Sequence, residues 1–263
     1  LPQLRAKDVS EIALRKPGDT LVLTRREGGW TVNGFPANTS AVEAFLATIG
    51  DTTLQSEVVS QSRASHQRLG VDSVNARRLT MTAGGTTVLD LWLGNRGPDF
   101  EGFYTRPEGS DRAYLLRGRF AEQTAMGVPE WREKQIATIA PDSVSKVEVG
   151  RGKTHWSLQR KGPGWDLSHG PADSTKVARF LGLLGGLRAA GFPDPAEMDS
   201  IHFDVPDRSL TVVSSGGQTL LSLVFDSTQQ GAFWVRSKAG GPVYRLDARI
   251  ADLATPAEST LRR

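Results

Sequence analysis

The sequence lacks cysteine, long apolar runs and any dense block of one charge. Because cysteine is absent, disulfides, thiolate zinc sites, iron–sulfur clusters and cysteine nucleophiles are all excluded. No stretch approaches the roughly 18 apolar residues that a membrane-spanning helix needs. The 32 basic residues only slightly outnumber the 29 acidic ones, which gives a net charge of +3. The basic pairs are scattered, so the sequence favours a mixed-charge solvated surface over a nucleic-acid interface.

Familiar catalytic and metal-binding motifs are also missing. The sequence contains no P-loop, no G-x-G-x-x-G fingerprint and no G-x-S-x-G nucleophile elbow. No two of its four histidines are spaced as H-x-x-x-H, the spacing that places two metal ligands on one face of a helix. We therefore expect no metal, no cofactor and no catalytic residue. A Ser–His–Asp triad assembled from distant positions stays open, because its members need not be neighbours in sequence.

The main positive feature is an internal repeat. Residues 9–50 align with residues 144–185 at a constant offset of 135, without a gap, and 12 of the 42 positions are identical. Further similarity follows, since "RRLTM" from Arg77 resembles "RSLTV" from Arg208, and "FYTR" from Phe103 resembles "FWVR" from Phe233. A period of this length indicates two domain-sized copies rather than a solenoid. We predict one copy over residues 1–127 and the other over residues 128–263.

The aligned segments predict strands, a turn and one helix in each copy. "EIALRK" and "KVEVGR" alternate or nearly alternate, as half-buried strands do, and glycine-containing turns precede a short strand that opens with tryptophan. Asn38 and Asp173 are then expected as N-caps. The following helices carry an apolar stripe at i, i+3, i+4 and i+7. The stripe residues are Val42, Phe45, Leu46 and Ile49 in the first copy, and Val177, Phe180, Leu181 and Leu184 in the second. We expect the second helix to run on through Leu187.

The rest of each copy is predicted to return to strands. The candidates are residues 77–83, 87–93, 102–106 and 113–117 in the first copy, and residues 208–214, 219–225, 232–236 and 243–247 in the second. Gly84–Gly85 and Gly216–Gly217 fall where hairpin turns belong. Consecutive strands joined by short turns indicate an α+β fold of two tandem repeats, each a mainly antiparallel sheet with one principal packed helix.

The repeated tryptophans, Trp30 and Trp165, have two interpretations. A functional one is a stacking platform for sugars or bases. A structural one is a core anchor beside Leu23 or Leu158. Because the tryptophans recur in both diverged copies next to alternating apolar residues, the core interpretation is favoured.

The assembled pattern resembles the DUF4340 domain family. Each copy has "GW" before a strand, a polar cap, a V-x-x-F-L helix, a hairpin and an aromatic-x-Arg strand. Family members carry a "YGLD-x-P" motif, of which "RLGVDSV" from Arg68 and "IHFDVP" from Ile201 are loose versions without the tyrosine. The resemblance implies a bacterial envelope location, with an N-terminal membrane helix that would lie upstream of Leu1. It also implies association with ABC-type transporters, including the gliding-motility type, and it carries over no catalytic residue.

The expected function is therefore a non-enzymatic, extracytoplasmic interaction or scaffold module that is tethered to a membrane and auxiliary to an ABC-type transport complex. One alternative is an accessory structural subunit of another large membrane complex. Another is a hydrolase or ligand-binding protein with a site between the repeats, since pockets often form at domain interfaces.

The loop "GNRGPDFEG", from Gly94 to Gly102, is the predicted partner-binding feature. It is longer than its counterpart "DSTQQG" and offers Arg96, Asp99 and Phe100 on a tip bounded by glycine and proline. An exposed Phe100 flanked by charges would anchor a protein partner. The alternative is a neutral hairpin tip, because loops tolerate change.

Overall fold

The chain forms two compact units. The computed structural model describes residues 5–50, 56–98, 102–118, 120–228 and 230–263. Unit 1 is Leu1–Glu133 and unit 2 is Lys134–Arg263. The sequence repeat places the boundary at residue 127. The structure keeps the next few residues in unit 1, where Trp131 is fully buried in the core.

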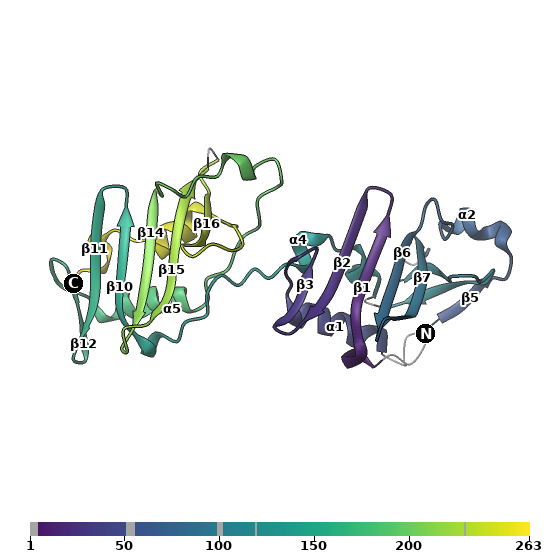
Figure 1. Ribbon diagram of the computed structural model, residues 1–263, viewed down its shortest axis with the longest axis horizontal. Helices are drawn as coiled ribbons and strands as arrows, with labels where there is room; N and C mark the ends of the chain where they lie inside the picture. The colour runs from purple at the N-terminus through teal and green to yellow at the C-terminus, as the bar shows by residue number, and fades with distance from the viewer. Residues whose placement is uncertain (1–4, 51–55, 99–101, 119, 229) are drawn as a thin grey trace. The chain divides into compact units, whose positions relative to one another are not determined.

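Unit 1 contains a nine-stranded antiparallel sheet in the order β4-β3-β2-β1-β6-β7-β8-β9-β5 (Figure 1). Its strands are β1 (Val9–Lys16), β2 (Asp19–Arg26), β3 (Gly29–Val32), β4 (Phe35–Pro36), β5 (Ser56–Ser60), β6 (Arg77–Ala83), β7 (Thr86–Arg96), β8 (Gly102–Pro107) and β9 (Ala113–Arg117). Its helices are α1 (Thr39–Gly50), α2 (His66–Leu69), α3 (Phe120–Ala125) and α4 (Val128–Trp131), with 3-10 turns at Ala6–Asp8 and Arg63–Ser65.

Unit 2 contains an eight-stranded antiparallel sheet in the order β13-β12-β11-β10-β14-β15-β16-β17 (Figure 1). Its strands are β10 (Val144–Arg151), β11 (Thr154–Lys161), β12 (Gly164–Leu167), β13 (Gly170–Pro171), β14 (Arg208–Ser214), β15 (Thr219–Ser227), β16 (Phe233–Ser237) and β17 (Tyr244–Leu246). Its helices are α5 (Ser174–Gly185) and α6 (Ala248–Ala254), with 3-10 turns at Pro141–Ser143, Met198–Ser200 and Glu258–Leu261. Apart from β5, which adds an edge strand to unit 1, the two sheets have the same strand order.

This arrangement confirms the predicted α+β fold with two similar halves. The elements from β1 to α1 and from β10 to α5 have equal lengths and keep the offset of 135 residues. The predicted caps are present, since the Asn38 side chain accepts a hydrogen bond from the amide of Ala41, and Asp173 accepts two from the amides of Thr175 and Lys176. All eight stripe residues of the two helices are buried.

The second helix is shorter than predicted. α5 ends at Gly185, and Leu187 lies beyond it, where its carbonyl accepts hydrogen bonds from the amides of Ile136 and Ala137. A Cβ at Gly185 would meet the carbonyl oxygen of Ile139 at 2.8 Å. The chain therefore stops being helical where it must pair closely with the segment that enters unit 2.

Each sheet buries one face, called here the inner face, beneath its principal helix. In unit 1 the inner-face side chains pack with α1, Phe120 and Trp131, and in unit 2 they pack with α5 and α6. The repeated tryptophans belong to these cores, since Trp30 is 3% exposed and Trp165 is 9% exposed. This burial confirms the core interpretation of both residues.

The last segment of each unit returns to the start of its principal helix. The amide of Asn38 donates to the carbonyl of Trp131, and the amide of Asp173 donates to the carbonyl of Leu261, each at 2.8 Å. Isolated bridges beside these bonds join Ala37 to Arg132 and Ala172 to Arg262. The two units are thus closed by the same device.

Within the part of the chain that the structure describes, no helix combines the length and the apolar character needed to cross a bilayer.

Candidate functional site

The predicted partner-binding loop is only partly described. Arg96 is the last residue of β7 and pairs with Phe103 of β8. Its neighbour Gly97 donates a backbone hydrogen bond to Gly102. Asp99 and Phe100 lie outside the described residues, so the predicted grouping of these two side chains with Arg96 stays a prediction.

A large cavity lies on the outer face of the unit 2 sheet, opposite α5. It is a groove of about 720 Å³ that crosses β11, β10, β14, β15 and β16, with the segment around Phe203 and Asp204 forming one wall. We call it the unit 2 groove. Its outward-facing side chains form two rows that follow the cross-strand pairs of the sheet. The first row is His155, Gly150, Ser209, Val224 and Arg236; the second is Ser157, Glu148, Thr211, Ser222 and Lys238.

The same two rows exist in unit 1, with different side chains. The first row there is Thr20, Arg15, Arg78, Trp92 and Arg106; the second is Val22, Ala13, Thr80, Asp90 and Glu108. At several positions of these rows unit 2 has a smaller residue than unit 1, although His155 and Glu148 are larger than their counterparts Thr20 and Ala13. Gly150 replaces Arg15, and Ser209 replaces Arg78. The groove exists because the backbone is shared and the side chains that would fill it are absent.

In unit 1 the corresponding face holds paired charges and a smaller cavity of about 420 Å³, which lies between the α2 segment and the side chains of Trp92, Arg106 and Glu108. Arg78 forms a bidentate ion pair with Asp90, with N–O distances of 2.8 and 2.7 Å, and this pairing raises the pKa of the arginine. The guanidinium groups of Arg78 and Arg106 both lie over the ring of Trp92, whose indole NH donates to Glu108. The α2 segment closes the face further, because Leu69, Val71 and Ala113 form a small apolar cluster there.

One arginine occupies the same row position in both units but has different partners. Arg106 donates hydrogen bonds to the carbonyl oxygens of Val71, Pro107 and Ser110, at 3.1–3.3 Å. Arg236 instead lies over the ring of Phe203, 4.5 Å from its centroid. Its Nε is buried and has no hydrogen-bond partner among the described residues. A buried donor without a partner is costly, so this atom requires an explanation.

The opposite end of the groove holds His155. A Cβ on Gly150 would meet the Nδ1 atom of this histidine at 2.9 Å and the Oγ of Ser209 at 2.6 Å. The imidazole therefore occupies space that only glycine leaves free. In the aligned repeat His155 stands at the position of Thr20, so the sequence gives it no partner in the other copy.

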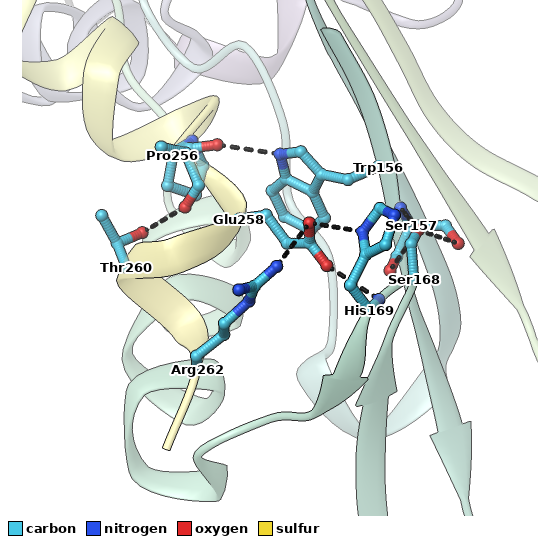
Figure 2. Close-up of polar contacts among 9 residues, drawn as sticks. Trp156, Ser157, Ser168, His169, Pro256, Glu258, Thr260 and Arg262 are labelled. Carbon is cyan, nitrogen blue, oxygen red and sulfur yellow. Dashed lines mark hydrogen bonds and ion pairs between the residues drawn. The ribbon is translucent and has the colours of Figure 1, made fainter.

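The wall beside His155 is held by hydroxyl groups. Ser168 Oγ accepts a hydrogen bond from the amide of Ser157 at 2.8 Å and lies 3.3 Å from the Ser157 hydroxyl (Figure 2). Trp156, the neighbour of Ser157 on β11, donates through its indole NH to the carbonyl of Pro256. These bonds tie the groove wall to the C-terminal segment.

His169, which follows Ser168 in the chain, is hydrogen-bonded to the C-terminal segment. Its amide and its Nδ1 donate to the two carboxylate oxygens of Glu258, at 3.0 and 2.9 Å, and Arg262 donates to the same carboxylate at 3.3 Å (Figure 2). Burial opposes ionisation of Glu258, but the hydrogen bonds from His169 and the charge of Arg262 outweigh it and hold the pKa below the ordinary value of 4.5. This cluster orders the wall and leaves the carboxylate ionised.

The remaining histidines do not gather with acidic side chains into a metal site. His66 is buried, and its Nε2 bonds the carbonyl of Asp111 at 2.9 Å. His202 donates through its amide to Asp226. Over the described ranges, no three His, Asp or Glu side chains lie close enough together to hold a metal ion.

Sequence reasoning missed the unit 2 groove, although a signal for it was present. The identical positions of the repeat mark the core. The groove is marked by the pairs that differ, such as Arg15 and Gly150 within the gap-free alignment. Arg15 and Gly150 lie on the face away from the helix, where neither copy needs apolar packing.

Comparison with known proteins identifies one family. A protein-family model described as "Domain of unknown function (DUF4340)" matches residues 30–206, which is well over half of the chain. No curated protein and no solved structure matches the chain.

Proposed function

Because the chain belongs to the DUF4340 domain family, we propose that it is a non-enzymatic, extracytoplasmic binding module, tethered to a membrane upstream of residue 1 and auxiliary to an ABC-type transport complex. In this proposal unit 1 carries the predicted partner-binding loop. Unit 2 carries the recognition site in its groove.

The observation that carries the proposal is the difference between the two outer faces. Both units keep the same strand order and the same helix packing. In unit 1 the outer face is filled by Arg78, Asp90 and Trp92, which pair with one another or with neighbours. In unit 2 these positions carry Ser209, Ser222 and Val224, and a groove results. A face that has lost its internal partners is available to another molecule.

The carboxyl groups whose pKa is clearly shifted hold local structure. The pKa of Asp72 is lowered by the side chain of Asn75, that of Asp173 by the amide of Lys176, and that of Glu258 also lies below its ordinary value. A carboxyl that acts as a general acid near neutral pH needs a raised pKa. The acidic residues whose pKa is clearly shifted are therefore tuned to hold structure.

The groove also bears on the ligand-binding alternative. It lies within unit 2 alone, so a ligand site in this protein does not require the two units to meet. A hydrolase would need an activated nucleophile beside a base. In the described part of the protein, the clamped imidazole of His169 has the carboxylate of Glu258 as its partner, and no serine hydroxyl bonds to it.

The proposed role is tested by purifying the tagged full-length protein from membranes of its own organism under mild detergent. We expect integral transporter subunits to co-purify. Recovery with a different large membrane assembly would support the accessory-subunit alternative. Recovery of the protein by itself, from membranes that still contain the assembled transporter, would remove the transport role.

A matched variant separates complex formation from use of the groove. Ser209→Arg with Ser222→Asp rebuilds the Arg78–Asp90 pair of unit 1 at the same sheet positions, so it is expected to fold. We expect this variant to keep its membrane partners while its groove is closed. Loss of the partners would instead place the complex itself on the groove.

A further inference from the structure

We propose that the unit 2 groove binds an acidic saccharide, a ligand that combines ring hydroxyl groups with an anionic group. This inference rests on the proposed function only in treating the groove as the binding site. It follows from three properties of the groove: its charge, its unpaired arginine and its hydroxyl floor.

The charge of the groove has changed relative to unit 1. At the end of the two rows formed by β6, β7 and β8, unit 1 has two cations and two anions. These are Arg78, Arg106, Asp90 and Glu108. The same positions in unit 2 are Ser209, Arg236, Ser222 and Lys238. Both carboxylates are gone, and one is replaced by an ammonium group. Arg236 and Lys238 are the groups at this end that can bind an anion, although the groove as a whole is not cationic, because Glu148 of the second row and Asp204 of the wall also line it.

Arg236 is prepared to bind that anion. Its ring contact with Phe203 holds the guanidinium in place, and the buried Nε has no partner among the residues that the structure describes. A guanidinium presents its donors as a planar fork that matches a carboxylate or phosphate in two parallel hydrogen bonds. Lys238, on the neighbouring row, adds a second positive charge at the same end.

The floor of the groove favours a polyhydroxylated ligand. Ser157, Ser209, Thr211 and Ser222 face it, and each hydroxyl can both donate and accept a hydrogen bond. Sugar hydroxyls have the same dual capacity, so the two sets can satisfy each other.

An extended peptide fits this surface less well. The strands beneath the groove are interior strands whose backbone groups already pair on both sides. A peptide therefore cannot add to the sheet there, which is the usual route to backbone recognition by a sheet. With about 720 Å³, the groove is also in the size range of small-molecule sites, roughly 300–1,000 Å³.

The test is calorimetric titration of the purified chain with five probes: an oligomer of galacturonic acid, glucose 6-phosphate, inorganic phosphate, a neutral maltose oligomer of similar length, and an oligomer of glutamate. We expect one or both anionic sugars to bind, and the preferred one identifies the anion as carboxylate or phosphate. The neutral sugar is expected to bind at least tenfold more weakly. The oligoglutamate is expected to show no comparable affinity.

Three variants assign the binding to the groove. Arg236→Gln removes the guanidinium and is expected to weaken binding at least tenfold. Ser209→Arg with Ser222→Asp fills the groove and is expected to abolish binding. Lys161→Gln is the control. Lys161 is an exposed cation of unit 2 that pairs with Asp166 and does not line the groove, so this variant is expected to bind as the parent does. Circular dichroism melts confirm that each variant is folded.

Several outcomes would overturn the inference. These are stronger binding of oligoglutamate than of either sugar, equal binding of inorganic phosphate and glucose 6-phosphate, unchanged affinity in a folded Arg236→Gln variant, or no binding of either anionic sugar. Because the titration needs no membrane partner, its failure would leave the proposed membrane complex standing. Likewise, if no membrane complex were recovered, sugar binding measured by titration would still support the inference about the groove.

Discussion

Arg160 lies over the indole of Trp165, with its guanidinium carbon 4.6 Å from the ring centroid. The Nε of Arg160 also donates to the carbonyl oxygen of Val144, where the first strand of unit 2 begins. Unit 1 repeats this relationship, because Arg25 lies 4.6 Å over Trp30 and donates to the carbonyl of Val9. The identical arginine and tryptophan of the two copies therefore have the same structural role. The arginine packs over the core tryptophan and hydrogen-bonds the start of the first strand.

Removing the tryptophan should destabilise unit 2. We expect Trp165→Ala to lower the free energy of unfolding by about 3–5 kcal/mol, because the substitution leaves a cavity in a packed core. Denaturant unfolding followed by circular dichroism measures the effect, and Trp165→Phe, which keeps part of the volume, should cost less. An unchanged unfolding midpoint together with altered ligand affinity would return the residue to the role of a stacking platform.

Gly94 tests the covering of the unit 1 outer face. A Cβ there would meet the carbonyl oxygen of Leu69 at 2.5 Å and a methyl group of Val71 at 2.7 Å. Because backbone cannot move aside cheaply, we expect Gly94→Ala to cost about 1–3 kcal/mol and to speed proteolysis of the α2 segment. Gly28→Ala is the control, since a Cβ at that position meets nothing within 4 Å. Equal stability of the two variants would show that the segment adapts freely.

The Glu258 carboxylate should contribute to stability in a pH-dependent way. Its pKa in the folded protein lies below the ordinary value of 4.5, so its contribution is present above that pH and is lost as the pH falls through the folded pKa. We expect Glu258→Gln to lower Tm by a few degrees at pH 7, and the difference from the parent to shrink below about pH 4. Thermal melts across pH measure this. Glu27→Gln, at an exposed turn, should show no such dependence, and a Tm difference that stays constant down to pH 3 would contradict the proposed pairing.

The predicted partner-binding loop can be tested through its side chains. We expect the triple substitution Arg96→Ala, Asp99→Ala and Phe100→Ala to leave thermal stability unchanged and to weaken recovery of a membrane partner by severalfold. Quantitative mass spectrometry of parallel purifications measures the recovery. The control is Gln230→Ala in the shorter counterpart loop. Full retention of every partner by the triple variant would remove this loop from the interface.

Much of the fold could be predicted from the sequence because the repeat reports the core. Val42 and Phe45 recur as Val177 and Phe180 since both helices must bury the same stripe, and the strand candidates after each helix lie within a few residues of β6–β9 and β14–β17. β5 and the α2 segment were not predicted, because they occur in unit 1 alone and carry no repeated pattern. The closing segments were also missed, since they bind mainly through backbone groups such as the carbonyls of Trp131 and Leu261.

The candidate site was far less accessible from sequence. A groove made by substituting glycine and serine for arginine leaves no motif, and its meaning depends on which face of the sheet Gly150 and Ser209 occupy. Arg236 is one of the repeated strand residues, because "FYTR" and "FWVR" share it. Only the contrast between its contacts and those of Arg106 shows that the two arginines have different surroundings.

The closing bonds set the order in which the two units can be completed during synthesis. Unit 1 needs the carbonyl of Trp131 to cap the start of its helix, so it can finish folding while most of unit 2 is still inside or on the ribosome. Unit 2 needs Leu261 for the same bond and cannot finish until that residue has emerged. A nascent chain therefore carries a finished first half and an open second half for the time it takes to translate unit 2. During that interval the apolar residues that α5 buries in the finished unit lack the bond from Asp173 to Leu261 that closes the fold.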